Sequence, residues 1–378
     1  GIETLKLNNA VNWVQRRWDG YTASVARSSI RVKNTSNVII SFSTAIQQIN
    51  TVLLVILGTY LIHSDDPHNR ITMGALIAAV ILSGRALAPL GQIASLATRF
   101  QQARLAMQGV NEIVRRPVER ESQTHYLTVK DIQGEFHFSA VTFFYKPELP
   151  AALKGMSVCI RPGEKVGIIG TIGCGKSTLL KMMVGLYRQN KGQITLDGVA
   201  MQQLDPCFVR DKVFLLEQNP RLFLGTLREN LQLSRLPGSL SDVDMINAAG
   251  RFGFDRFIRH HPCGLDMQIG EGGQGLSGGQ RQMVALTRMV LGSPRVVLLD
   301  EPTTGLDLQT ENIVLKGLNH WSRGRTMVVV THRLQVLNIV DRIIVMNEGR
   351  VMMDGPRDEI LKKLSGKQQS GESRAITS

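Results

Sequence analysis

The chain begins with a polar, basic segment and continues with two long apolar runs. Residues 38–62 carry no charged side chain over 25 residues, and residues 71–90 carry only Arg85. The polar residues 63–70 separate the two runs. At about 1.5 Å per residue, each run is long enough as a helix to cross a hydrocarbon core of about 30 Å. The pattern predicts two membrane helices, and two long helices of a soluble protein are the alternative.

Charged and polar residues add expectations about this helical hairpin. Lysines and arginines lie outside both runs and the connecting loop leans acidic, so the positive-inside rule places both ends in the cytoplasm. Gln47, Gln48 and Asn50 would each be unfavourable facing lipid, and Arg85 would cost about 2.5–3.5 kcal/mol at a helix centre. These side chains are expected to face a bundle interior or a polar path. Pro89 is expected to bend the second helix.

The pattern of apolar and polar residues changes after residue 108. Residues 109–131 are polar and contain Pro117, which predicts a linker between a helical region, 1–108, and a second domain. Short β-rich segments then alternate with helical ones, which favours an α/β domain with a largely parallel sheet over residues 132–364. A mostly helical stretch between 219 and 291 is expected to be an inserted subdomain. The polar tail, 365–378, is expected to be disordered.

Composition adds little that decides the function. The net charge is +13, with an excess of 7 in residues 1–130 and 6 in residues 131–378. Such charge suits nucleic acid or an anionic membrane surface, and equally a generally basic solvated surface. The four cysteines are scattered, which favours neither a disulfide framework nor a zinc site and suggests a reducing cytosol. The chain starts at Gly1 without a leader, which predicts no signal peptide and a fragment of a longer protein.

A phosphate-binding loop is the strongest local motif. The segment "GTIGCGKST" matches G-x-x-x-x-G-K-[ST], follows an apolar strand and precedes a helix. Its backbone N–H groups and the helix N-terminus suit phosphate, while Lys176 would reach the β- and γ-phosphates and Ser177 would ligate Mg²⁺. The expected nucleotide-binding residues are Gly170, Thr171, Ile172, Gly173, Cys174, Gly175, Lys176, Ser177 and Thr178.

Two further segments suit nucleotide chemistry. "RVVLLDEP" is an apolar strand that ends in two carboxylates, where Asp300 suits Mg²⁺ and Glu301 suits activation of a water. Alone, two adjacent acids could merely cap the next element, but the upstream phosphate loop favours catalysis. "LSGGQRQ" opens a helix and supplies a second candidate anion site. Its residues are Ser277, Gly278, Gly279 and Gln280.

In order and spacing, these motifs resemble the nucleotide-binding domain of ABC ATPases over roughly residues 134–364. The resemblance covers the phosphate loop, the signature "LSGGQ" and the second Walker motif "VVLLDEP". It also assigns a Q-loop glutamine, a D-loop aspartate, a switch histidine, an adenine-stacking aromatic and a loop that senses membrane helices. These are Gln218, Asp307, His332, Tyr145 and Glu271, respectively.

The resemblance implies that two ATP molecules with Mg²⁺ are sandwiched in a head-to-tail homodimer of ATPase domains. The implied catalytic residues are Glu301, His332, Gln218 and Lys176, and the implied metal ligands are Ser177, Gln218 and Asp300. Tyr145 could instead be a packed aromatic beside Phe143 and Phe144. Cys174 and Glu217 depart from the commonest residues at their positions, but neither change removes a catalytic group.

An ABC domain fused after two membrane-length runs is the arrangement of an exporter. Residues 81–107 are similar to the exporter subunits of bacterial type I secretion systems, a resemblance that covers residues 1–120. It implies a partial transmembrane domain in a multi-pass inner-membrane protein, with the ATPase domain in the cytoplasm. It further implies contact with membrane lipid, a periplasmic adaptor, an outer-membrane channel and a secreted protein cargo, and no nucleic acid. A bacteriocin or peptide exporter, a lipid or drug exporter, and a soluble ABC ATPase acting on nucleic acid are the alternatives.

Overall fold

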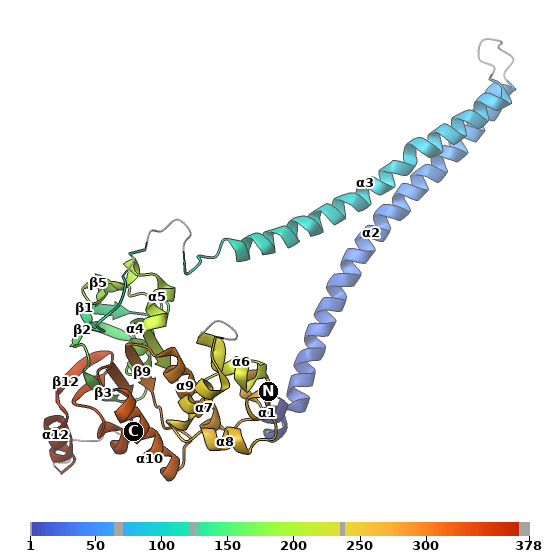
Figure 1. Ribbon diagram of the computed structural model, residues 1–378. Coiled ribbons are helices and arrows are strands. Elements are labelled where there is room, and N and C mark those ends of the chain that lie inside the picture. The colour runs from blue at the N-terminus through green and yellow to red at the C-terminus, as the bar shows by residue number, and fades with distance from the viewer. Residues whose placement is uncertain (1, 64–70, 121–125, 128, 235–238, 370–378) are drawn as a thin grey trace. The chain divides into compact units, whose positions relative to one another are not determined.

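The computed structural model describes residues 2–63, 71–120, 126–127, 129–234 and 239–369. The chain divides into two compact units, Gly1–Pro117 and Val118–Ser378. The first unit is helical, and the second contains the β-sheets with their covering helices (Figure 1). This order confirms the predicted fold class, a helical region followed by an α/β ATPase domain.

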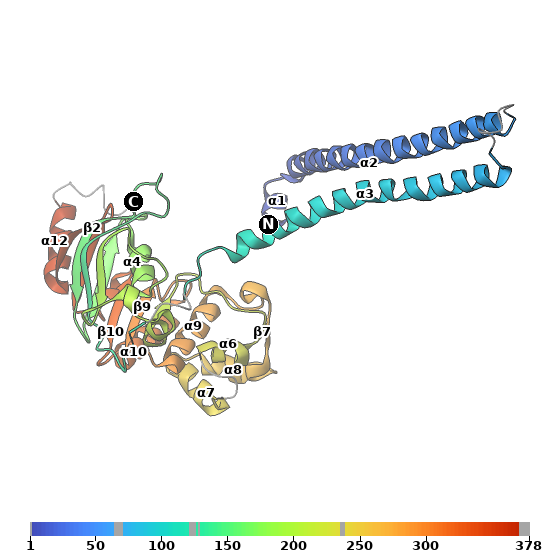
Figure 2. The ribbon, with the colours of Figure 1, turned by 90° about the horizontal axis from the view of Figure 1, so that it is seen from above.

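The helical unit consists of α1 (Ile2–Leu7), α2 (Val11–Ile62) and α3 (Met73–Val114). Near the loop that joins them, α2 and α3 pack side by side as a hairpin (Figure 2). The Asn50 amide donates a hydrogen bond to the Ser83 hydroxyl across this hairpin. Gly58 permits a close approach, because an added Cβ would lie 2.2 Å from Leu76 Cδ1. Asn50, one of the polar residues in the first apolar run, thus has a hydrogen-bond partner inside the hairpin.

The helices differ in length from the predicted apolar runs. Among the described residues, α2 is the one helix long and apolar enough to cross a membrane, and 73–86 is a shorter apolar stretch. The second predicted span, 71–90, is therefore met only in part. α3 passes through Pro89 and continues to Val114, so the first six residues of the expected linker are helical. Polar residues also form helices, so α2 and α3 extend beyond the apolar runs into the polar segments on either side.

The central sheet of the second unit has six strands in the order β12-β11-β3-β10-β9-β6. Neighbouring strands from β11 to β6 are parallel, and only β12 pairs antiparallel with β11. This confirms the predicted, largely parallel sheet. The strands are β3 (Lys165–Gly170), β6 (Val213–Leu216), β9 (Val296–Asp300), β10 (Thr326–Val330), β11 (Arg342–Asn347) and β12 (Arg350–Pro356).

A second, antiparallel sheet has the strand order β2-β1-β4-β5. Its strands are β1 (Phe136–Phe143), β2 (Leu153–Ile160), β4 (Lys191–Leu196) and β5 (Val199–Ala200). Helix α4 (Lys176–Met183) lies between the sheets, because its Leu179 shares a buried cluster with Phe138 and Val328. On the other face of the central sheet, Val329 packs in a second cluster with α9 and α10. Burial on both faces explains why β9 and β10 are continuously apolar.

The remaining helices cover the central sheet and form the predicted helical subdomain. They are α5 (Pro206–Lys212), α6 (Leu227–Leu231), α7 (Asp242–Gly250), α8 (Asp255–His260), α9 (Gly278–Gly292), α10 (Leu308–Trp321), α11 (Leu334–Leu337) and α12 (Arg357–Gln369). A two-stranded ribbon pairs β7 (Gly225–Thr226) with β8 (Gln268–Ile269). Because α12 reaches Gln369, the first five residues of the tail expected to be disordered are helical, and 370–378 lie outside the described residues.

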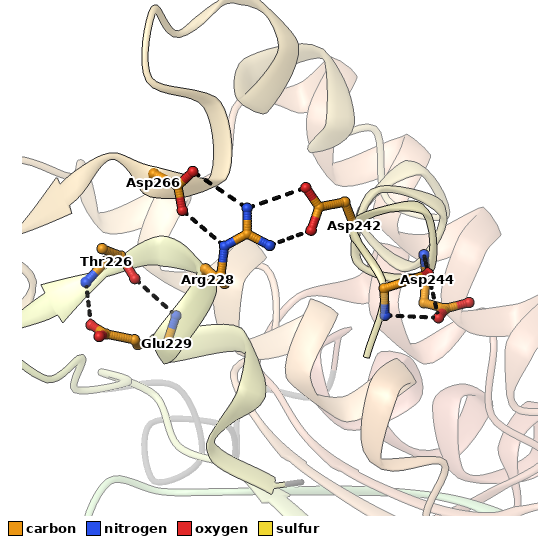
Figure 3. Close-up of polar contacts among 7 residues, drawn as sticks. Thr226, Arg228, Glu229, Asp242, Asp244 and Asp266 are labelled. Atoms are coloured by element: carbon orange, nitrogen blue, oxygen red, sulfur yellow. Dashed lines mark hydrogen bonds and ion pairs between the residues drawn. The ribbon is translucent and has the colours of Figure 1, made fainter. Parts of the chain in front are cut away.

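One arginine joins three parts of the helical subdomain. Arg228, in the first turn of α6, hydrogen-bonds Asp242 at the start of α7 and Asp266 just before β8 (Figure 3). Its Nε donates to Asp266 Oδ1 at 2.8 Å. These hydrogen bonds hold the pKa of each aspartate below its usual value. Thr226 and Glu229 close the N-terminus of α6 with a reciprocal capping box.

Candidate nucleotide site

The phosphate loop lies between the end of β3 and the start of α4, as predicted. Gly175 precedes the helix with φ +100°, and its carbonyl accepts the Leu179 N–H at 2.9 Å. Lys176 is buried, and its ammonium donates to the carbonyl oxygens of Gly170 at 2.7 Å and Thr171 at 2.9 Å. The loop therefore concentrates positive charge where the helix N-terminus already favours an anion.

The two predicted carboxylates lie at the carboxyl end of β9, beside the phosphate loop. The Ser177 side chain lies beside Asp300, the buried last residue of β9. Burial raises the Asp300 pKa, and the Ser177 hydroxyl and nearby Lys176 oppose that rise. Glu301 follows with φ +50°, a conformation that costs about 1–2 kcal/mol for a residue with a Cβ. A strained backbone thus sets the direction of the Glu301 carboxylate.

His332, predicted to be the switch histidine, approaches Glu301 because parallel strands bring their carboxyl ends to one edge of the sheet. Val330, the last residue of β10, pairs with Asp300, and the Glu301 N–H donates to the Val330 carbonyl at 2.9 Å. His332 Nε2 then lies 3.8 Å from Glu301 Oε1. Burial raises the Glu301 pKa, an effect that His332 opposes and Asp300 reinforces. A carboxylate with a raised pKa, largely shielded from solvent, suits proton acceptance.

Oxygen donors at this edge fit Mg²⁺. Ser177 and Asp300 contact each other, and Gln218 is exposed just beyond β6, the strand that neighbours β9. The described residues contain no group of three or more His, Cys, Asp or Glu side chains suited to a metal ion. Mg²⁺ commonly binds through one or two protein oxygens and completes its shell with water and phosphate. The predicted ligands Ser177, Gln218 and Asp300 thus form a chemically suitable set.

Tyr145 is anchored beside the phosphate-loop helix. Its hydroxyl lies 2.8 Å from the Thr178 hydroxyl, and its ring meets Phe143 and Tyr187 edge-on at centroid distances of 5.0 and 5.3 Å. About half of Tyr145 stays exposed. The residue is therefore part of an aromatic cluster, as the alternative expected, while enough of it is accessible for stacking on a base.

The signature segment forms the N-terminus of α9 and lies on a different element from the phosphate loop. Ser277 accepts the Gln280 N–H at 3.2 Å, and the Gln280 side chain accepts the Ser277 N–H at 2.8 Å. Gly278 and Gly279 form the intervening first turn. Asp307 caps α10 by accepting the Thr310 N–H at 2.9 Å, and its capping hydrogen bonds lower its pKa. Both segments are ordered helix starts.

Three residues lie in or beside the motifs but were given no role from the sequence. Thr303 and Arg333 each contact the buried carboxylate of Glu311 on α10. Gln282 on α9 donates from its amide to the Glu301 carbonyl at 3.5 Å. Thr303 is eight residues before Glu311, Gln282 is 19 residues before Glu301, and Arg333 comes from the loop after β10, so the contacts depend on the folded arrangement.

Comparison with known proteins extends beyond the site. Residues 153–304 match the family model described as ABC transporter. The leukotoxin translocation ATP-binding protein LktB of Mannheimia glucosida is 34% identical over 92% of this chain and 48% of its own length. The toxin RTX-I translocation ATP-binding protein of Actinobacillus pleuropneumoniae is 32% identical over 97% of this chain and 50% of its own length. The chain thus spans about half the length of these curated relatives.

A solved structure supports the fold. A bacterial Atm1-family ABC exporter with ATP bound aligns with a TM-score of 0.82 at 24% identity, covering 98% of this chain and 65% of that one. The alignment includes the helical unit as well as the ATPase unit.

Proposed function

We propose that this chain, whose residues 153–304 match the family model described as ABC transporter, forms part of an ATP-driven exporter, the inner-membrane ATPase of a type I protein secretion system. One observation carries the proposal: relatives named for toxin translocation match 92–97% of the chain, so the likeness includes the helical unit. A likeness confined to the ATPase domain would support ATP hydrolysis without indicating its purpose.

In this proposal the site hydrolyses ATP. Lys176 exchanges its bonds to the loop carbonyls for phosphate oxygens, and Tyr145 stacks on the adenine. Ser177, Asp300 and Gln218 would hold Mg²⁺, and the bound ion would supply charge neutralisation for the phosphates. Glu301 orients and deprotonates the attacking water. His332, 3.8 Å from Glu301, contacts the γ-phosphate and fixes the orientation of the carboxylate.

The signature segment acts across a dimer. Ser277, Gly278, Gly279 and Gln280 present helix-terminal N–H groups, which suit the γ-phosphate of ATP held by a second copy. Asp307 stands at the start of the neighbouring α10 and completes the same surface, since Gly279 packs closely on the Gly305 carbonyl of the D-loop. ATP binding would then close two copies head to tail, and hydrolysis would let them separate.

The helical unit would lie in the membrane. The uncharged part of α2, residues 38–62, is long enough to span, and lysine and arginine residues lie on the far sides of both apolar runs. The Asn50–Ser83 hydrogen bond satisfies an amide that would be unfavourable in lipid. An adaptor in the periplasm, an outer-membrane channel and a protein cargo complete the proposed system.

The test compares proteins secreted by the source organism with wild-type Glu301 and with Glu301→Gln in the complete protein. Glu359→Gln, at an exposed position on α12, a helix that carries no predicted site residue, is the matched control. Loss of one or a few large proteins from the medium and their retention in Glu301→Gln cells supports type I secretion. Retention of a small peptide with an uncleaved leader would indicate peptide export. An unchanged protein profile, with the transporter expressed, would overturn protein secretion and point to a lipid or small molecule.

A further inference from the structure

A buried carboxylate lies behind the Glu301–His332 pair. Glu311, on α10, is only 2% exposed. Its Oε1 accepts a hydrogen bond from the Thr303 hydroxyl at 2.8 Å and lies 2.7 Å from Arg333 Nη1. We call these three residues the carboxylate bridge. A carboxylate this far from solvent is stable as an ion only when charged and hydrogen-bonded partners compensate it, and Arg333 and Thr303 do so here.

The partners of Glu311 belong to the two loops that carry the catalytic pair. Thr303 is two residues after Glu301, in a turn closed by the bond from the Thr304 N–H to the Glu301 carbonyl at 3.2 Å. Arg333 is the residue after His332. The carboxylate bridge therefore links the loop after β9 to the loop after β10.

Apart from the backbone bond from the Glu301 N–H to the Val330 carbonyl at 2.9 Å, the direct side-chain contacts between the two loops are long. The Thr331 hydroxyl lies 3.5 Å from Glu301 Oε2 and also accepts the Arg333 N–H at 3.0 Å. His332 is about half exposed, and its ring is 3.8 Å from Glu301. Contacts of this length do not by themselves fix the histidine, because hydrogen bonds weaken steeply beyond their normal range. The shorter, buried contacts of Glu311 are better suited to hold the spacing.

We infer that Glu311 is a positioning residue that holds His332 against Glu301 through the carboxylate bridge. It touches neither the substrate nor the reacting atoms. Its place on α10 adds a consequence, since its N–H donates to the Asp307 carbonyl at 2.8 Å, one turn earlier. This is an ordinary backbone bond of α10, so the residue whose side chain contacts Arg333 also lies one helical turn after the predicted D-loop aspartate. The inference rests on the proposed function, in which Glu301 and His332 act on ATP.

The test uses Glu311→Gln in the complete protein, reconstituted in nanodiscs, with ATP turnover, ATP binding and thermal stability all measured. Gln keeps the size and an acceptor for Thr303 but removes the charge that holds Arg333. We expect kcat to fall about 10- to 100-fold, the cost of a small misplacement of a catalytic group, while the KM for ATP stays within about threefold. Thr303→Val and Arg333→Lys should lower kcat in the same direction and less severely.

Glu164→Gln is the matched control. Glu164 also pairs with a largely buried arginine, since its Oε1 lies 3.1 Å from Arg342 Nη1. It directly precedes β3, at the end of the sheet opposite to the phosphate loop. Glu164→Gln should lower stability without changing kcat. If Glu311→Gln behaves like this control, losing stability while its folded fraction turns over normally, Glu311 has only a structural role. Should Glu311→Gln fail to fold, unchanged kcat in both Thr303→Val and Arg333→Lys overturns the inference.

A double-mutant cycle gives a second readout. If Glu311 acts through His332, Glu311→Gln should cost little further turnover once His332 is alanine, since interacting residues are non-additive. Independent, multiplicative losses would overturn the positioning role. Wild-type protein that does not hydrolyse ATP would instead refute the proposed function itself, so the two failures are distinguishable.

Discussion

Replacing Gly175 by alanine should destabilise the ATPase unit more than the same change at Gly173, two residues earlier in the phosphate loop. Both have positive φ, +100° at Gly175 and +80° at Gly173. An added Cβ at Gly175 would lie 2.5 Å from the Ala152 carbonyl oxygen, whereas at Gly173 it would meet no heavy atom within 4 Å. The two positions therefore share a backbone cost and differ in a steric one.

The magnitudes follow from these two terms. Positive φ costs about 1–2 kcal/mol for a residue with a Cβ. Contact with a backbone atom that must move adds about 1–3 kcal/mol, the usual range for overpacking. Gly173→Ala should thus lower the free energy of unfolding by about 1–2 kcal/mol, and Gly175→Ala by about 2–5 kcal/mol. At about 2–4 °C per kcal/mol, the Tm values of the two variants should differ by at least about 2 °C.

Calorimetry of the complete protein without nucleotide measures this difference, because nucleotide would add a binding contribution to the apparent stability. Equal lowering of Tm in the two variants would refute the close approach of the phosphate loop to Ala152. A Tm that falls more in Gly173→Ala would refute the loop conformation as a whole. If the difference holds, the third glycine of the motif is needed for packing against the β1–β2 connection as well as for its backbone angles.

Three further predictions concern single side chains. Lys176→Ala should weaken ATP binding about 10- to 100-fold, the equivalent of one or two charged hydrogen bonds, measured by equilibrium titration with a fluorescent ATP analogue. Glu301→Gln should retain ATP binding but lose about 10²- to 10⁴-fold in kcat in a coupled ATPase assay, and normal turnover would contradict its role as base. Arg228 lowers the pKa of Asp242 and Asp266, so their stabilising contribution is present above the unfolded pKa of about 4 and is lost as pH falls below it. Arg228→Met should therefore flatten the loss of urea resistance as the pH falls below about 4, and an unchanged acid profile would contradict it.

The phosphate loop, the strand-end acids and the parallel sheet were predictable because each depends on a short contiguous pattern. Glycine spacing defines the loop, and apolar runs of about five residues define strands buried on both faces. The ends of the long helices were not predictable in this way. Hydropathy marks the start of the first apolar run at residue 38 and the end of the second at residue 90. The helices extend further, since α2 starts at Val11 and α3 ends at Val114. Between residues 11 and 38 the sequence contains no proline, so nothing in the backbone interrupts the helix.

Glu311 shows why the rest of the site escaped prediction. In the sequence it is one acid in the polar start of a helix, "LDLQTEN", where an exposed acid favoured by the helix dipole is the ordinary expectation. Its burial depends on how α10 packs beneath two strand ends that are separated from each other by about thirty residues, and its partners come from both. A sequence motif identifies the residues that bind or act on the substrate, because binding and catalysis require particular residue types at a fixed spacing. The distance between Glu301 and His332 is set by groups on a third element, and only the folded arrangement reveals which residues those are.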